Sequence, residues 1–211
     1  MPQYQVFSIC KNTIKYGTAV LNPVKMDNVS ETLRENLKGL PENYVVMVVS
    51  DSNTYLETNL AILKGLIAEG NTIIFVTMIR PAAVLAQLFD LNSIDKSKVY
   101  IVDCVSTLTQ QYIKHTEHEV YVQPNNLSAI AMAVNEMALS LEGKKIVIFD
   151  SPSTLMVYNS LNEIMKFALF ITSKIRLENL KGILLSVQED MSSEILNGLR
   201  HVSDKVINLN K

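Results

Sequence analysis

The sequence predicts a three-layer α/β/α domain in which helices cover both faces of a mostly parallel sheet. Short apolar runs rich in valine and isoleucine alternate along the chain with longer stretches of helical periodicity. A continuous apolar run is typical of a strand buried on both faces, and helices between such strands indicate right-handed crossovers. With 211 residues, 48% of them hydrophobic, the chain can bury one large core. We therefore expect a single domain over residues 1–211, with a core over 41–211 and a less regular extension over 1–40.

The first half of the core contains three predicted strands and two predicted helices. The first strand is apolar throughout, and the helical pattern after it stops at Gly70, a residue type that commonly ends helices. Pro81 stands where a helix can begin, because the first turn needs no backbone donor there. The expected elements are strands Tyr44–Ser50, Thr72–Thr77 and Val99–Asp103 and helices Asn59–Glu69 and Pro81–Phe89.

The second half continues the same alternation. One helical pattern ends before Gly143, and a longer amphipathic pattern follows the next strand. The expected strands are a short Glu119–Val122, then Lys145–Asp150, Gly182–Val187 and Lys205–Leu209, and the expected helices are Asn126–Leu141, Ser160–Arg176 and Ser192–His201.

The first forty residues give weaker patterns. Asp27 or Ser30 is a suitable cap for a helix that runs to Leu37, and Pro41 would end it. Residues 4–19 alternate weakly between apolar and polar types, which predicts an edge hairpin.

Charge and cysteine content limit the classes of partner and the compartment. The formal net charge of −2 gives no broad attraction to DNA, RNA or an anionic membrane. Cys10 and Cys104 form no CxxC pair, so we expect two buried thiols in a reducing cytoplasm and no zinc site. The N-terminus has no secretory signal pattern, and every apolar run is shorter than the ~20 residues of a spanning helix. These observations predict a cytoplasmic protein without a membrane segment.

Nucleotide chemistry in an open parallel sheet is expected just beyond the carboxyl ends of the strands. A phosphate-binding loop after the first strand would read GxxxxGK[ST], because glycines let backbone amides wrap the phosphates and lysine neutralises their charge. On that template Ser50 and Tyr55 replace the two glycines. Leu56 replaces the lysine and Glu57 replaces the hydroxyl residue. Asp51 adds a second carboxylate to the loop, so triphosphate binding in the usual mode is disfavoured.

The fourth clear strand ends in an aspartate, in the run KIVIFDSPSTL. Four apolar residues followed by Asp150 have the form of a Walker B strand, whose carboxylate supports magnesium. The alternative is that Asp150 caps the following turn, where Ser151, Ser153 and Thr154 offer suitable hydroxyl groups. The capping interpretation is the favoured one.

The order of these segments resembles the KaiC/RecA-like ATPase domains of archaea, especially their degenerate single-domain members. The resemblance extends from residue 41 to residue 209, and rests on TMIRPAAVLAQLF, VYIVDCVS and KIVIFDSPSTL. It implies a RecA-like, P-loop NTPase-type sheet with ATP between the first strand and the Walker B strand. Only Asp150 matches an active member, because the Walker A residues are missing. Met78, Ile79 and Arg80 occupy the place of the catalytic acid.

The leading hypothesis is therefore a non-catalytic, pseudo-ATPase module that regulates or assembles through protein contacts, with self-association suggested by RecA-like relatives. It predicts no catalytic residues and no nucleotide cofactor. The alternative is a nucleotide or small-anion binder with an atypical loop. That protein would use Ser52, Asn53 and Thr54 as donors, and Asp150 would hold a metal such as the Mg²⁺ of ATP. Nucleic-acid binding is a weaker third hypothesis, which the charge balance disfavours.

Four other groups of residues invite a functional reading. Arg80 can pair with a ligand anion, although a salt bridge to Asp103 is favoured. His115 and His118, with Glu117 and Glu119, are interpreted as an exposed polar loop and not as a metal site. Ser151, His201 and Asp103 could form a catalytic triad, but the sequence lacks the nucleophile elbow that usually accompanies one. Tyr112, Tyr121 and Lys114 could bind nucleic acid, but no basic cluster surrounds them.

Overall fold

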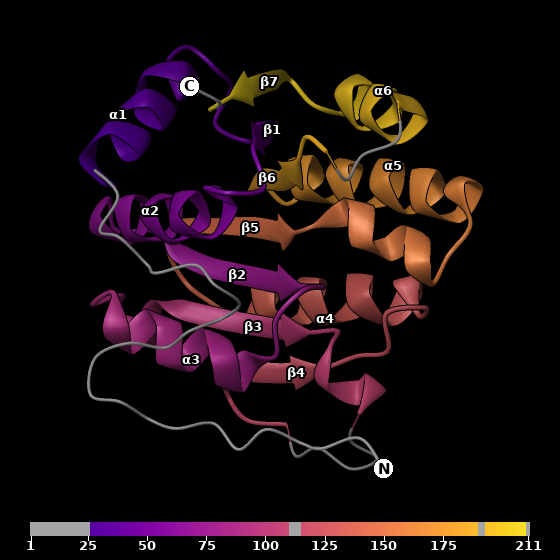
Figure 1. Cartoon of the computed structure of the whole chain (residues 1–211). Helices are drawn as coiled ribbons and strands as arrows, with labels where there is room; N and C mark the ends of the chain where they lie inside the picture. The colour runs from indigo at the N-terminus through magenta and orange to yellow at the C-terminus, as the bar shows by residue number, and fades with distance from the viewer. Residues whose placement is uncertain (1–25, 110–114, 190–192, 210–211) are drawn as a thin grey trace.

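The computed structural model describes residues 26–109, 115–189 and 193–209. Its centre is a seven-stranded sheet in which every paired strand is parallel, with helices on both faces (Figure 1). The three-layer α/β/α prediction is therefore confirmed. In chain order the strands are β1 (Val45–Ser50), β2 (Thr72–Thr77), β3 (Val99–Asp103), β4 (Glu119–Tyr121), β5 (Lys145–Asp150), β6 (Lys181–Val187) and β7 (Lys205–Asn208).

Helices connect successive strands, as the periodicity predicts. The α-helices are α1 (Met26–Leu37), α2 (Tyr55–Ala68), α3 (Ala82–Leu91), α4 (Leu127–Ser140), α5 (Leu161–Leu177) and α6 (Ser193–Val202). Three short 3₁₀ helices are η1 (Lys96–Lys98), η2 (Ser106–Leu108) and η3 (Pro152–Val157). None of the described helices combines the length and apolarity that crossing a membrane requires.

The strand order, β4-β3-β2-β5-β6-β1-β7, determines which strand ends become neighbours. The chain passes from β1 to β2, continues outward to β3 and β4, and later returns to insert β5 and β6 between β1 and β2. Only β6 therefore separates β1 from β5. Because strands lie about 4.8 Å apart, the ends of β1 and β5 are roughly 10 Å from each other.

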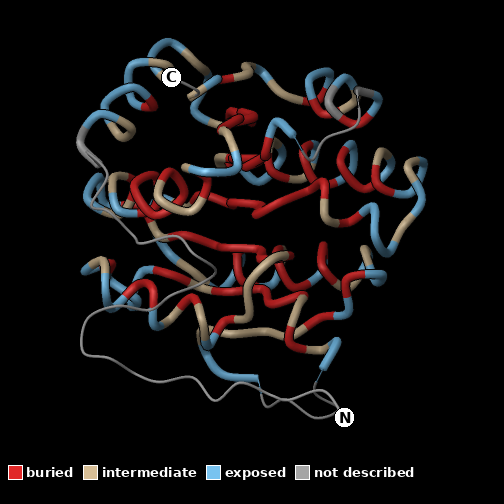
Figure 2. The backbone as a smooth tube through the Cα atoms, in the orientation of Figure 1, coloured by how far each residue is buried: buried red, intermediate tan, exposed pale blue. Residues whose placement is uncertain are grey.

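Side chains alternate between the two faces of the sheet and fill two apolar cores (Figure 2). On β5, Ile146 and Ile148 belong to the core beneath α1, α2 and α3, whereas Val147 and Phe149 belong to the core beneath α4, α5 and α6. The same alternation directs Asp150 toward α2. The carboxyl edge of β5 thus presents its aspartate to the helix that follows β1.

Two segments differ from or refine the predictions. Helix α2 begins at Tyr55 instead of Asn59, because the loop before it is ordered by Asp51, as described below. Helix α1 belongs to the core, since Leu33 is 3% exposed and Ser30 Oγ donates to the carbonyl of Ala61 in α2 at 3.0 Å. The predicted hairpin over residues 4–19 lies outside the described residues.

Candidate functional site

The carboxyl edge of β5 is tied to the start of α2 by a buried hydrogen bond. The hydroxyl of Tyr55, the first residue of α2, donates to Oδ1 of Asp150 at 2.5 Å. Asn59, one turn further along the same helix face, donates its Nδ2 to the same oxygen at 3.3 Å. Tyr55 is 5% exposed and Asp150 is 1% exposed. The Tyr55 side chain thus spans the crevice between β1 and β5 and excludes water from the carboxylate.

Burial changes the proton affinity of both partners. Desolvation raises the pKa of Asp150 above its usual value, while the Tyr55 hydrogen bond and the positive charge of Arg80 each offset part of that rise. Burial also raises the pKa of Tyr55 well above 10, and the neighbouring carboxylate adds to the rise. Tyr55 therefore remains a hydrogen-bond donor throughout the neutral range.

The loop between β1 and α2 is organised by the carboxylate of Asp51. Oδ1 of Asp51 accepts from the backbone amides of Asn53 at 2.9 Å and Thr54 at 3.1 Å. Oδ2 accepts from the Thr54 hydroxyl at 3.1 Å. Free amides at the start of a helix are the groups that bind phosphate in proteins. Here a carboxylate of the chain itself already occupies the two amides that directly precede α2.

The three residues predicted as atypical phosphate ligands therefore differ in availability. Ser52 and Asn53 have exposed side chains at the tip of the loop. Thr54 is half-buried and its hydroxyl is engaged by Asp51. Asp150, the predicted metal ligand, is buried and accepts from the Tyr55 hydroxyl. The structure brings this predicted set to one end of the sheet, but not around a common open centre.

The predicted salt bridge between Arg80 and Asp103 is wrong. The buried carboxylate of Asp103 instead accepts from the amides of Ala82, Val105 and Ser106 and from the Ser106 hydroxyl, at 2.7 to 2.9 Å. It thereby caps α3 and η2, which follow β2 and β3. Its two oxygens carry four bonds to local donors, so little acceptor capacity remains for a guanidinium.

Arg80 instead lies near Asp150. Its charge lowers the pKa of Asp150, and Nη1 of Arg80 is buried without a hydrogen-bond partner among the described residues. The amide and carbonyl of Arg80 both bond to the hydroxyl of Thr77 at the end of β2. Arg80 thus places a positive charge near the buried carboxylate of Asp150, and its role as an anion ligand stays a prediction.

The turn after β5 is built without the carboxylate that was expected to cap it. Ser151 Oγ and Ser153 Oγ lie 2.8 Å apart, and the Thr154 amide donates to the carbonyl of Ser151 at 3.1 Å. The hydrogen bonds of the Asp150 carboxylate go to α2 instead, so the capping interpretation is wrong. Ser151 shares no catalytic arrangement with His201, which is exposed on α6.

The histidines near β4 support the edge of the sheet. Nδ1 of His115 accepts from the amide of Tyr121 at 3.2 Å, and the His118 ring stacks on Tyr100 with centroids 4.4 Å apart. Within the described ranges no three histidine, cysteine or acidic side chains group as metal ligands. Of the other predicted candidates, Cys104 is buried. Cys10, Tyr112 and Lys114 fall outside the described residues.

Sequence reasoning missed Tyr55 and Asn59 as members of this site. Tyr55 was recognised only as a poor replacement for the second glycine of a P-loop. Its spacing of four from Asn59 places both side chains on one helix face, which was a readable signal. What the sequence did not contain was the direction of that face, since it depends on β5 being inserted two strands away from β1.

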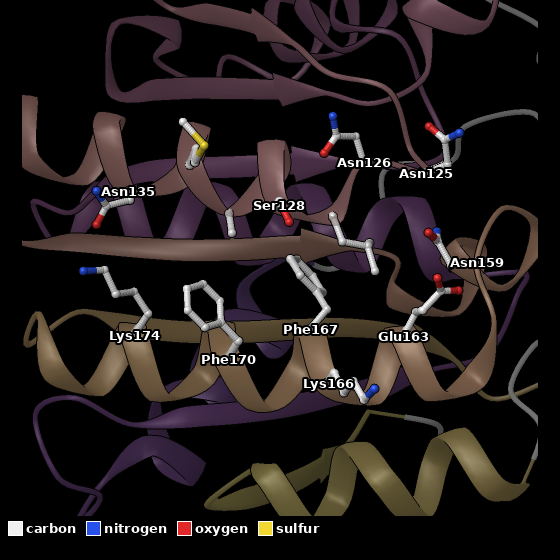
Figure 3. Close-up of a pocket in the computed structure, with 13 residues that line it drawn as sticks. Asn125, Asn126, Ser128, Asn135, Asn159, Glu163, Lys166, Phe167, Phe170 and Lys174 are labelled. Atoms are coloured by element: carbon white, nitrogen blue, oxygen red, sulfur yellow. The ribbon is translucent and has the colours of Figure 1, made fainter.

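A second concave feature lies away from the crevice, between α4 and α5. It is a groove of about 700 Å³ (Figure 3). Its α4 side includes Ser128, Met132 and Asn135, and its α5 side includes Phe167 and Phe170. This groove was not predicted from the sequence.

Comparison with known proteins supports the fold. No protein-family model and no curated protein matches the sequence. The solved structures that resemble the fold include a KaiC-like protein from the hyperthermophilic archaeon Pyrococcus horikoshii, with a TM-score of 0.60 at 18% identity. The match covers 82% of this chain and 73% of that chain. At this identity the likeness concerns the fold, and the predicted RecA-like, KaiC-like sheet is confirmed.

Proposed function

We propose that this chain is a non-catalytic RecA-like module, a pseudo-ATPase of the cytoplasm that acts through protein contacts. The observation that carries the proposal is the buried bond between Tyr55 and Asp150. In the family that the sequence resembles, the nucleotide lies between the first strand and the Walker B strand. Here a tyrosine of the chain crosses that space and satisfies the Walker B-like carboxylate.

The residues present do not suit a nucleotide with its magnesium ion. A metal at Asp150 would have to displace the Tyr55 hydroxyl and enter a site from which burial has removed water. A phosphate at the loop would have to displace the Asp51 carboxylate from two amides. At ~4 Å and an effective dielectric near 20, an anion left beside Asp51 would meet a repulsion of about 4 kcal/mol. No step of catalysis is therefore assigned to this crevice.

A second candidate function rests on Arg80. Its buried, unpaired Nη1 is a donor beside the crevice, which favours a site for a small anion or a nucleotide phosphate bound through an atypical loop. The remaining donors would be the exposed side chains of Ser52 and Asn53. This alternative requires Asp51 to turn away from the amides that it now holds.

Thermal unfolding with and without millimolar ATP or ADP and magnesium separates the two functions. A ligand at ~100 times its dissociation constant adds about 2.7 kcal/mol, which raises the melting temperature of a domain this size by several degrees. We expect no shift beyond that caused by magnesium chloride alone. A nucleotide-specific shift that disappears in Arg80→Ala would replace the proposal by the anion-binding alternative.

A matched variant tests whether the crevice is closed by the residues named. Asp51→Asn keeps an oxygen acceptor for the two amides and removes the negative charge from the loop. If this variant also shows no nucleotide-specific shift, the Tyr55 ring is sufficient to keep the crevice closed. If it gains one that the natural chain lacks, the charge of Asp51 is the closing element, and the proposal stands with that refinement.

A further inference from the structure

Large apolar side chains that remain exposed are concentrated on one face of the molecule. Ten such side chains are found in the described part of the chain. Seven of them lie on α4, α5 and η3, and an eighth, Tyr158, directly follows η3. Met132 of α4 is 61% exposed and Phe170 of α5 is 58% exposed, on opposite sides of the groove. Exposed apolar side chains that flank a groove often mark an interaction site.

Helix α5 presents an ordered stripe of four residues to this groove. Glu163, Phe167, Phe170 and Lys174 follow a spacing of four, three and four, which keeps them on one helix face. All four are labelled on the groove side of α5 in Figure 3. Phe167 is 8% exposed and forms part of the groove floor, whereas Phe170 projects from the rim.

The stripe is self-complementary when α5 meets a second α5 running in the opposite direction. A two-fold axis that crosses the helix midway between Phe167 and Phe170 places each of these rings opposite the other ring of the copy. The same axis places Glu163 opposite Lys174, since each lies about 8 Å from the midpoint at 1.5 Å per residue. A parallel arrangement would instead oppose like charges at both ends.

From this pattern we infer that the groove between α4 and α5 is a two-fold contact between two copies of this chain. Phe170 of each copy packs on the floor of the other groove beside Phe167, and the Glu163 and Lys174 pairs form the two ends. An isologous contact of this type is the commonest symmetry of protein dimers. The inference deepens the proposed function and rests on it, because it names the contact through which such a module acts.

The charges of the groove favour a copy over a strongly acidic or basic partner. Glu163 at one end accepts from the amide of Ser160 at 2.8 Å and from its hydroxyl at 2.7 Å through Oε2, and Lys166 lies nearby. Lys174 at the other end pairs with Glu178 at 2.8 Å. Acid and base thus occur at both ends, and the middle is apolar. A partner of one charge sign would gain little here, whereas the reversed stripe of a second copy meets an opposite charge at each end.

The decisive experiment exchanges the charges in separate chains and then mixes them. Sedimentation velocity over a concentration series should show a dimer for the full natural chain. Lys174→Glu alone opposes Glu163 with glutamate at both ends, and Glu163→Lys alone opposes lysine with lysine. Each variant should raise the dimer dissociation constant about tenfold or more. An equimolar mixture of the two should dimerise again, because each contact then joins opposite charges.

Glu163→Lys also breaks the capping box that Glu163 forms with Ser160 at the start of α5, so the helical circular dichroism of both charge variants is compared with that of the natural chain. Recovery by mixing then excludes damage to the fold as the cause of dissociation, because a misfolded chain gains nothing from a second misfolded chain. Leu91→Glu is the matched control, since Leu91 is 52% exposed on α3 at the opposite face. It should leave the dimer unchanged. Phe170→Asp should dissociate it without a loss of helical circular dichroism.

Several outcomes would overturn the inference. If the natural chain is monomeric at every concentration, the two-fold contact does not exist. The same holds if the groove binds only a helix of another protein. A dimer that survives both charge variants and Phe170→Asp uses another face. The nucleotide experiment is independent of these results, because it can be repeated on the monomeric variants. If the dimer test fails and nucleotide causes no shift in melting temperature, only the two-fold contact at the groove is rejected. If nucleotide causes a shift, only the proposal that the nucleotide crevice is closed is rejected.

Discussion

The Tyr55 hydroxyl and Oδ1 of Asp150 lie 2.5 Å apart, although the two residues are separated by 95 positions in the chain. The bond joins the first residue of α2 to the last residue of β5 and crosses above β6. It therefore connects the two halves of the sheet at the edge where RecA-like domains bind nucleotides.

Tyr55→Phe should destabilise the fold by about 1.5–3 kcal/mol, because it leaves a buried carboxylate without its shortest hydrogen bond. Urea unfolding at neutral pH measures the loss. Tyr158→Phe is the control, since Tyr158 is 38% exposed and its change should stay within about 0.5 kcal/mol. Equal effects of the two substitutions would mean that the Tyr55 bond contributes nothing specific.

Asp150→Asn should make stability less dependent on pH. Burial in the folded state raises the pKa of Asp150 above the ordinary value of an aspartate, so the native state holds the proton more tightly than the unfolded chain. The resulting stabilisation is complete below the unfolded pKa and is lost as pH rises through the folded pKa. Asparagine does not titrate, so the free energy of unfolding of the variant minus that of the natural chain should increase over this interval, by at most about 1.4 kcal/mol per pH unit. Parallel pH curves from urea unfolding would contradict the assignment.

Asp51→Ala should lower stability by about 0.5–2 kcal/mol, because the hydrogen bonds that order the loop before α2 lose their acceptor. Two backbone amides and the Thr54 hydroxyl lose their acceptor together. In a domain of this size the loss corresponds to about 2–4 °C in melting temperature for each kcal/mol. Ser52→Ala, in the same loop but exposed, should change the melting temperature little. An Asp51→Ala melting curve that coincides with that of Ser52→Ala would show that the hydrogen bonds accepted by Asp51 do not contribute to stability.

The fold was predictable because its signal is local. The apolar runs of β1 and β5 need no knowledge of partners. Gly70, at φ 83°, marks the end of α2 by a conformation that other residues rarely adopt. The start of α2 was predicted four residues late, because the pattern of apolar residues begins later than the loop that Asp51 orders directly before the helix.

The site was less predictable because its contacts join distant segments. A salt bridge between Arg80 and Asp103 was reasonable from charge alone, yet the amides of Val105 and Ser106 are two and three residues from Asp103 and reach its carboxylate at little entropic cost. The stripe on α5 was readable in the sequence as a spacing of four, three and four. Its significance appears only when the groove between α4 and α5 is seen to leave Phe170 exposed.

Asp103→Ala should be among the most destabilising substitutions at the carboxyl edge of the sheet. It removes an acceptor of four hydrogen bonds from a side chain that is 0% exposed, and three backbone amides lose their partner. A loss of more than about 3 kcal/mol is expected, since each buried unpaired donor costs about 1–3 kcal/mol. Ser106→Ala removes one of the four donors and leaves the acceptor in place, so its loss should be about 1 kcal/mol. Urea unfolding of both variants measures the difference, and a loss from Asp103→Ala no larger than that from Ser106→Ala would contradict the capping role.

The effect of Gly65→Ala on the free energy of unfolding should change sign with the residue at position 30. An alanine Cβ at Gly65 would lie 2.7 Å from Oγ and 2.9 Å from Cβ of Ser30, so α1 would have to move away from α2. The substitution should therefore destabilise the natural chain by about 1–3 kcal/mol. In a Ser30→Gly background both contacting atoms are gone, and the same substitution should stabilise α2 by about 0.5–1 kcal/mol through helix propensity. Urea unfolding of the four chains in this cycle gives the coupling directly. An effect of the same sign and size in both backgrounds would mean that α1 does not rest on Gly65.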